Sequence, residues 1–416
     1  MGKPFLSRHF LAEQASCLAG IPFAAAGAAE EGVATTHNLL ALGTWCQDAQ
    51  ESRLTLLDLA VGHSGDEIVR QPAMARLASF QHRGRVAALE ASGAAVADCG
   101  GGAVLVLAGS GDGAVARLRL QVPTQPGSLP ADIQLREEDF DGALLLPWLE
   151  PHAGAVTALA ANPDRRELLS AGADGSLALA PLEAGDGTAG SRLYGSAGAV
   201  TFAAARWNGP HTAVTGSLQG LVHVWDARQA GRPALQLLQP AAGSAAAAGA
   251  GLGLAAPAPA ITCLDVHPAQ HFCCATGGDD GGVAVWDLRA ASSSGAGGSA
   301  AAASPGTAAA AAAAQKAAVT CCSVGGGGPG DVPAAVCDVR FEGAGGIGSG
   351  SRRLVFCTAG GAIGVLREAA AGAAPRLLFR EPAAAVRACC LGAAGPCSQL
   401  FSVTDQEGLV YMANAL

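Results

Sequence analysis

A short pattern of apolar and polar residues recurs seven times along the chain. Each copy has a turn residue, usually glycine, and then apolar residues at alternate positions, as in 221–226 (LVHVWD) and 282–287 (GVAVWD). Alternation with a period of two residues is typical of a β-strand that turns its side chains to opposite faces. Another apolar strand precedes each turn, for example 212–217 (TAVTGS) and 272–278 (FCCATGG). The pattern therefore predicts a series of β-hairpins.

Glycine marks most of the turns between these strands. Asp-Gly stands at 112–113, 174–175 and 280–281. Such turns need a positive φ, which glycine adopts without steric cost. The predicted turn glycines are Gly113, Gly175, Gly220, Gly281, Gly361 and Gly408, and Ser52 takes their place in the degenerate first copy.

The spacing of the copies indicates a repeat architecture. They end at residues 57, 118, 180, 225, 286, 366 and 413, and a further apolar strand, such as 154–159 (GAVTAL), precedes most hairpins. A blade of a WD-repeat propeller has four strands in ~40–45 residues. Three of the four longer intervals approach this length when insertions at 121–142, 241–257, 290–316 and 325–333 are left out, and the first, from 57 to 118, keeps an excess that we assign to long loops around 60–72 and 97–102. We therefore predict an all-β fold, a single seven-bladed WD40 β-propeller over residues 1–416.

The insertions differ from the repeats in composition. Residues 241–257 and 290–316 consist mostly of Ala, Gly and Ser. Such tracts lack the apolar surface that would offset the loss of chain entropy on folding, so we predict largely disordered loops. The acidic stretch 136–142 (REEDFDG) is most simply interpreted as a solvated loop. A docking loop for a basic partner is the alternative.

The final repeat supplies three strands, whereas a blade needs four. An unpaired outer strand would leave backbone groups open to pairing with other chains. Residues 4–14 (PFLSRHFLAEQ) precede the first repeat and have no other evident role. We predict that they form the outer strand of the last blade and so close the propeller.

Two repeats end in Trp-Asp, at Trp225–Asp226 and at Trp286–Asp287. The same dipeptide at the same place in two copies is typical of a structural repeat. We predict that the tryptophans pack between neighbouring sheets and that the aspartates form hydrogen bonds near the strand ends.

Composition narrows the possible chemistry. The net charge is −9 and no block of Lys and Arg stands out, so we do not expect direct binding to nucleic acid, which needs cations for the phosphates. The 13 cysteines include no CxxC pair. We interpret them as buried free thiols of a protein in a reducing compartment.

The sequence contains no complete catalytic or cofactor motif. The GxGxxG pattern at 343–348 lies between two predicted strands, without the helix that would receive a pyrophosphate. His82 and His152 precede first strands, where we expect a hydrogen bond within the blade. His271 lies near Cys273 and Cys274, but neighbouring strand residues point to opposite faces, which argues against a metal site. We predict no catalytic residue, no cofactor and no metal, and hence no enzyme.

Three stretches carry a resemblance to a known family. They are 39–59 (LLALGTWCQDAQESRLTLLDL), 213–238 (AVTGSLQGLVHVWDARQAGRPALQLL) and 261–289 (ITCLDVHPAQHFCCATGGDDGGVAVWDLR). They resemble the small WD-repeat nucleoporins, of the forty-three-kilodalton type, in the Y-shaped outer-ring complex of the nuclear pore.

The resemblance implies a scaffold subunit at the nuclear envelope. Its expected partners are an α-solenoid nucleoporin and a neighbouring WD-repeat propeller of the same complex, and its expected role is to support translocation of proteins and mRNA. The resemblance implies neither membrane insertion, direct nucleic-acid binding nor self-association outside the assembly.

The alternative function is that of a substrate receptor for a cullin-RING ubiquitin ligase. Many such receptors look similar in carrying Trp-Asp-x-Arg at strand ends, as at 225–228 and 286–289. In that class the arginine contacts the adaptor, so Arg228 and Arg289 would be the contact residues.

Overall fold

Short strands separated by tight turns make up most of the structure, as the alternation of apolar residues requires. The computed structural model describes residues 4–26, 33–65, 67–93, 103–123, 129–162, 164–183, 190–196, 198–241, 258–292, 318–324, 334–342, 353–367, 375–381, 383–392 and 399–414. Besides strands, the described residues form one helix, α1 (Leu288–Ser292), and two single-turn 3-10 helices, η1 (Pro130–Asp132) and η2 (Glu137–Asp139). None of these helices is long and apolar enough to cross a membrane.

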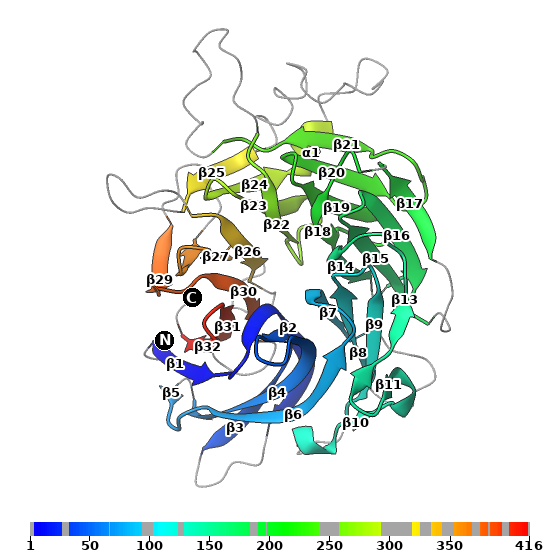
Figure 1. The fold of residues 1–416 in the computed structure, drawn as a ribbon. Coiled ribbons are helices and arrows are strands. Elements are labelled where there is room, and N and C mark those ends of the chain that lie inside the picture. Colours follow the sequence, from blue (N-terminus) through cyan, green and yellow to red (C-terminus); the bar gives the residue numbers. More distant parts are fainter. Residues whose placement is uncertain are drawn as a thin grey trace. The chain divides into compact units, whose positions relative to one another are not determined.

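The chain divides into two units. The first comprises Met1–Gly172, Ala178–Ser191 and Arg387–Leu416, and the second comprises Ala173–Leu177 and Arg192–Val386. In the described part of the chain the strands form seven sheets (Figure 1).

The first unit contains the sheets built from both ends of the sequence. One sheet has the order β1 (Phe5–Phe10), β32 (Gly408–Ala413), β31 (Gln399–Thr404), β30 (Val386–Leu391). The next contains the long strands β2 (Gln14–Ala26), β3 (Ala34–Cys46), β4 (Glu51–Ser64) and β6 (Ala73–His82), with β5 (Glu67–Ile68) on β4 and with β12 (Leu144–Leu145) and β11 (Phe140–Asp141) beyond β6. The third contains β7 (Val86–Ser92), β8 (Ala103–Ser110) and β9 (Val115–Gln121), with β10 (Gln134–Leu135) and β13 (Pro147–Leu149) both paired to β9.

A fourth sheet contains the residues at which the chain passes from one unit to the other. Its strands are β14 (Val156–Asn162), β15 (Glu167–Gly172), β16 (Ser176–Pro181) and β17 (Ser191–Gly195).

The second unit contains three four-stranded sheets whose strands follow in chain order. They are β18 (Phe202–Trp207), β19 (Thr212–Ser217), β20 (Leu221–Asp226) and β21 (Leu235–Leu238); β22 (Ile261–Val266), β23 (Cys273–Gly278), β24 (Gly282–Asp287) and β25 (Ala318–Ser323); and β26 (Val336–Phe341), β27 (Leu354–Thr358), β28 (Ala362–Leu366) and β29 (Arg376–Arg380). Such sheets are the blades of a β-propeller. The prediction of an all-β chain built from propeller blades is confirmed.

The first strands of the sheets share a β-bulge. In β22, Ile261 pairs with Gly278 but Cys263 pairs with Gly277, so that one residue is left over between them. The same shift occurs near the start of β2, β7, β14, β18 and β26. A bulge increases the local twist and redirects the side chains beside it.

The residue before the bulge packs on a glycine of the preceding sheet. Within the first unit, Val86 lies against Gly43 and Val156 against Gly109; within the second, Ile261 lies against Gly216 and Val336 against Gly277. A Cβ atom on any of these glycines would come closer than 3.0 Å to the valine or isoleucine side chain. Glycine is therefore required there by the approach of two sheets, and not by a turn.

Hydroxyl groups beside the bulge join the same pairs of sheets. Ser16 Oγ donates to the carbonyl oxygens of Gly43 and Val86, at 3.1 and 2.8 Å. Thr262 Oγ1 donates in the same way to the carbonyl oxygens of Gly277 and Val336. Each hydroxyl thus bonds to its own sheet and to the following one.

Five of the predicted turn glycines have a left-handed backbone. Their φ values are +95° at Gly113, +76° at Gly175, +75° at Gly220, +74° at Gly281 and +78° at Gly361. Where Asp precedes the glycine, its carboxylate accepts from the backbone N–H after the glycine, as from Ala114, Ser176 and Gly282.

The structure corrects the prediction for the first and last hairpins. Glu407, with φ +59°, has the left-handed backbone in the last hairpin, and Gly408 is the first residue of β32. In the first hairpin the left-handed residue is Gln50, with φ +54°, and Ser52 lies inside β4. The left-handed position is set by the length of the loop, and neither hairpin has glycine at that position.

The first predicted insertion also differs from expectation. Within 121–142, residues 129–142 contain η1, β10, η2 and β11, because β10 pairs with the outer edge of β9 and β11 pairs with β12 beyond β6. Of the other predicted insertions, the structure describes residue 241, which is exposed, and residues 290–292, which belong to α1. Residues 242–257, 293–316 and 325–333 lie outside the described residues.

The N-terminal segment forms an outer strand. β1 pairs antiparallel with β32 from Phe5 opposite Ala413 to Phe10 opposite Gly408, and Leu11 N–H donates to the Glu407 carbonyl at 2.8 Å. The pairing covers the first part of the predicted segment 4–14, and β2 begins at Gln14.

We predict that Gly216→Ala lowers the apparent Tm, because the new methyl group would overlap Ile261; overpacking of this kind costs about 1–3 kcal/mol. Ile261→Ala should also be destabilising, but the double variant should lose less than the two single effects combined, since each change relieves the other. Gly20→Ala is the control, because a Cβ there meets its nearest neighbours at 3.6 Å. Additive effects of Gly216→Ala and Ile261→Ala in thermal unfolding would contradict this packing.

Deletion of residues 1–10 should lower the apparent Tm, because it removes β1 and exposes the edge of β32. Deletion of residues 1–4 leaves the paired residues in place and serves as the control. Equal melting of the two truncated proteins would show that β1 contributes nothing to the stability of this sheet.

Candidate interaction sites

The two tryptophans of the Trp-Asp motifs are buried structural residues. Trp225 Nε1–H donates to Thr215 Oγ1 at 2.9 Å, and Trp286 Nε1–H donates to Thr276 Oγ1 at 2.8 Å. Both indole rings are at most 1% exposed. Each bond joins the third strand of a sheet to its second strand, so the tryptophans fix packing and are not available to a partner.

Other polar residues in these and other sheets form comparable hydrogen bonds. Thr276 Oγ1 donates onward to Gln239 Oε1 at 2.7 Å, which extends the network of Trp286. In the β14–β17 sheet, where Ala180 stands at the tryptophan position, His152 Nε2 and Ser170 Oγ lie 3.0 Å apart and form a buried hydrogen bond. His82 Nδ1 instead bonds to the carbonyl of Gly84 at 2.7 Å, within its own turn.

The aspartates of the motifs bind the arginines that follow them. Arg228 Nε and Nη2 donate to both carboxylate oxygens of Asp226, at 2.9 and 2.7 Å, and this bonding lowers the pKa of Asp226 to about 2. Arg289 makes the same pair of bonds to Asp287, at 3.0 and 2.6 Å. The arginine side chains are 64% and 62% exposed, so both guanidinium groups lie at the surface.

His223 lies in a buried aromatic cluster of the second unit. Its ring stacks on Trp225 with centroids 5.6 Å apart and meets the edge of Phe202 at 5.7 Å. The residue is 2% exposed, and its Nδ1 atom has no hydrogen-bond partner among the described residues. Burial in these surroundings lowers the pKa of His223 from 6.5 to about 4.

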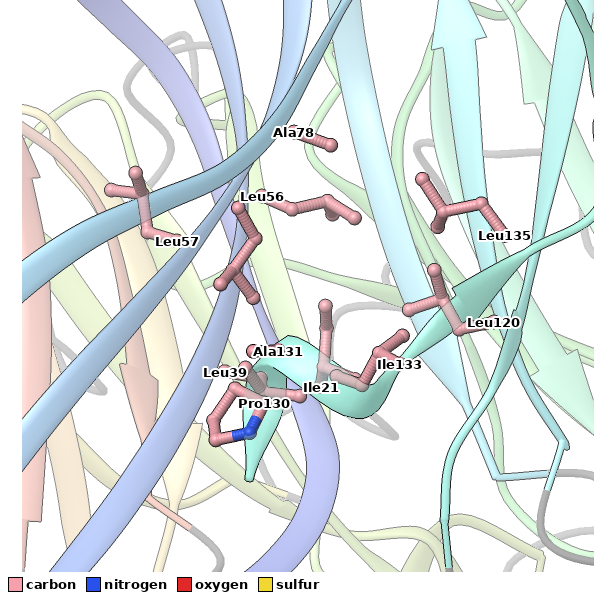
Figure 2. A pocket seen from close by; sticks show the side chains of 11 residues that line it. Ile21, Leu39, Leu56, Leu57, Ala78, Leu120, Pro130, Ala131, Ile133 and Leu135 are labelled. Carbon is pink, nitrogen blue, oxygen red and sulfur yellow. The ribbon is translucent and has the colours of Figure 1, made fainter. Parts of the chain in front are cut away.

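An apolar cavity lies between two sheets of the first unit (Figure 2). Its volume is about 90 Å³, and its walls are apolar side chains of the β2–β6 sheet on one side, including Ile21 and Leu56, and Leu120 and Leu135 on the other. Pro130 and Ala131 of η1 lie at one end of the cavity.

The acidic stretch beside this cavity is anchored by one arginine. Arg119 donates from Nε and Nη2 to Asp139 Oδ1, at 3.0 and 2.7 Å, and its backbone N–H donates to Asp139 Oδ2 at 2.7 Å. Asp139 is 5% exposed, which corrects the interpretation of 136–142 as a simply solvated loop. Its neighbours Glu137, Glu138 and Asp141 are exposed, and Glu138 also contacts Arg119 at 3.0 Å.

The described residues contain no group of three or more His, Cys, Asp or Glu side chains placed to hold a metal ion. His271 is exposed, whereas Cys273 and Cys274 are buried. The GxGxxG pattern at 343–348 lies outside the described residues.

We expect stability to fall in acid because of His223. Its pKa is lower in the folded protein than the ordinary 6.5, so the unfolded chain binds the proton more readily. Stability is therefore full above pH 6.5 and is lost as the pH falls toward 4, by up to about 1.4 kcal/mol per pH unit. The apparent Tm of His223→Phe should change less between pH 7 and pH 5 than that of the unaltered protein. The exposed His271→Gln should behave as the unaltered protein does; equal acid sensitivity in all three would exclude His223 as the cause.

Comparison with known proteins agrees with these observations. The family described as WD domain, G-beta repeat matches residues 145–179 and 254–287. The second match ends with Trp286–Asp287, and the first contains His152 and Ser170. These segments include the first three strands of their respective sheets.

A nuclear pore protein from a plant is similar to part of the chain. Nuclear pore complex protein NUP43 of Arabidopsis thaliana is 26% identical over 123 residues, which are 30% of this chain and 31% of the relative. The expected resemblance to a WD-repeat nucleoporin is thus confirmed. The chain contains WD40 repeats, folded as propeller blades, and is similar over part of its length to a nuclear pore complex protein.

Proposed function

We propose that residues 1–416 form one seven-bladed WD40 propeller. The seven sheets support this proposal, because each contains a consecutive run of strands from one sequence repeat. In the sheet of β30–β32, β1 provides the fourth strand, so we propose that β1 closes the propeller.

We further propose that the protein is a non-enzymatic scaffold subunit of the nuclear pore complex, in its Y-shaped outer ring. The observation that carries this proposal is the similarity over 123 residues to a nuclear pore complex protein, combined with the blade fold. The proposed partners are an α-solenoid nucleoporin and a neighbouring WD-repeat propeller. The proposed location is the nuclear pore in the nuclear envelope, where the scaffold supports nucleocytoplasmic transport of proteins and mRNA.

The chemistry of the motifs supports a role in binding. The Trp-Asp tryptophans and His152 are used for hydrogen bonds inside sheets, and the aspartates are used to hold arginines. Catalysis would require a nucleophile, base or poised carboxylate pair in a site that a substrate can reach. Rigid sheets with varied surface loops are instead suited to holding other proteins in a fixed geometry.

A second candidate function, substrate receptor of a cullin-RING ubiquitin ligase, rests on Arg228 and Arg289. Both guanidinium groups are more than half exposed and are held in the same way by the preceding aspartate. A pair of cations at matching places in consecutive sheets is suited to contact one adaptor, although the guanidinium of Arg289 also stacks on the ring of Phe272. Because the ion pair with the preceding aspartate already gives each arginine a structural role, we rank the receptor function second.

Purification of the tagged full-length protein from its own cells should separate the two functions. We expect outer-ring nucleoporins to copurify and the protein to localise at the nuclear envelope. Arg228→Ala/Arg289→Ala should leave this association intact, because exposed ion pairs of this kind contribute little to the fold. An adaptor and a cullin in the eluate without nucleoporins, lost on substitution of both arginines, would replace the scaffold proposal by the receptor proposal.

A further inference from the structure

Residues of the exposed segment 129–142 line part of the apolar cavity in the first unit. Ala131 lines the cavity and is itself exposed, and Leu129, two residues earlier, is 47% exposed. A single exposed leucine is ordinary, but one in the segment that lines an apolar cavity extends the apolar surface around that cavity. Figure 2 shows η1 at one end of the cavity, between the walls formed by the two sheets.

The outer edge of β9, beside the cavity, cannot accept a further strand at the positions where it is already paired. β9 pairs with β13 at Val115 and Ala116 and with β10 at Leu120 and Gln121. The backbone groups that would bind an extended peptide are therefore already used by this chain at both ends of β9. On the β9 side of the cavity, recognition therefore relies on side chains, which favours a helix in an apolar groove over an added strand there.

The charge around the cavity specifies the polar face of such a helix. Asp132 follows Ala131 directly, and the exposed Glu137, Glu138 and Asp141 follow in the same segment. The nearby basic side chains include Arg119, which is engaged by Asp139 and Glu138, Arg136 in the same segment, and the exposed Arg76, which is paired with Leu57 of the cavity wall. Segment 129–142 itself carries five acidic residues and one arginine, and it complements a basic partner.

We propose that the cavity and the acidic segment 129–142 form a docking site for a basic amphipathic α-helix of a partner protein. One leucine-sized side chain of the helix enters the cavity, its apolar neighbours one turn away cover Leu129, and its Lys and Arg residues face Glu137 and Asp141. The inference rests on the proposed scaffold function and deepens it, because an α-solenoid partner is built from helices.

A photo-crosslinking amino acid in place of Ala131, in the full-length protein in its own cells, tests the occupant directly. We expect a crosslink to a helical segment with alternating apolar and basic faces. The same amino acid in place of the exposed Ala230, in the second unit, is the control and should not give that product. A crosslink only to acidic or non-helical segments, or none, would overturn the docking proposal.

The affinity of a synthetic peptide with the sequence of the crosslinked helix then measures how much the cavity and the acidic residues each contribute to binding. Ala131→Trp, which obstructs the cavity, should weaken binding at least tenfold by fluorescence anisotropy. Glu137→Lys/Asp141→Lys should weaken it several-fold and reduce its dependence on salt. Asp48→Lys/Asp279→Lys makes the same change in net charge on exposed loops elsewhere and should have little effect. Unchanged affinity in the first two variants would refute the site.

The result also separates this proposal from the proposed function. A crosslinked basic helix that belongs to a protein outside the nuclear pore would support the docking site and contradict the scaffold role. Copurification of outer-ring nucleoporins with Ala131→Trp and the charge-reversal variant at unaltered levels, without a crosslink at position 131, would support the scaffold role and exclude this docking site.

Discussion

The contact between a glycine in one sheet and a β-branched side chain in the next sheet is the constraint on which the structure depends. It occurs at Gly43–Val86 and Gly109–Val156 in the first unit and at Gly216–Ile261 and Gly277–Val336 in the second. The β-bulge directs the Val or Ile toward the glycine, and Ser16 or Thr262 adds a hydrogen bond across the same interface. Because these features lie in the inner part of each repeat, the turns and outer strands can vary without loss of sheet packing.

The Trp-Asp motif is one of several solutions to the same packing problem. Trp286, Thr276 and Gln239 form a continuous hydrogen-bonded chain, whereas His152 and Ser170 form a shorter one beside Ala180. A buried hydroxyl group has a hydrogen-bond partner in either arrangement, whereas a buried hydroxyl group without one would lower the stability of the fold. This equivalence shows how the repeat of β14–β17 can lack Trp-Asp and still form a blade.

Much of the fold could be predicted from sequence, because apolar alternation and Asp-Gly turns are local signals. The left-handed residues Gln50 and Glu407 could not, since their backbone is set by the loop in which they lie and not by residue type. The strands β10 to β13 are two or three residues long, too short for any periodicity to mark them. Gln239 likewise carries no local signal, because its partner Thr276 is distant in sequence. The cavity depends on how β9, η1 and the β2–β6 sheet come together, which no single segment encodes.

The way in which segment 129–149 returns to β9 has a consequence for the behaviour of the protein at high concentration. An exposed, straight sheet edge is a template on which other chains can add strands and start insoluble aggregates. Here β10 and β13 occupy the two ends of that edge, and between them the backbone N–H of Arg119 is bonded to Asp139 of η2. The segment therefore protects β9 from self-templated fibre growth, a liability of β-rich chains that carry few charges.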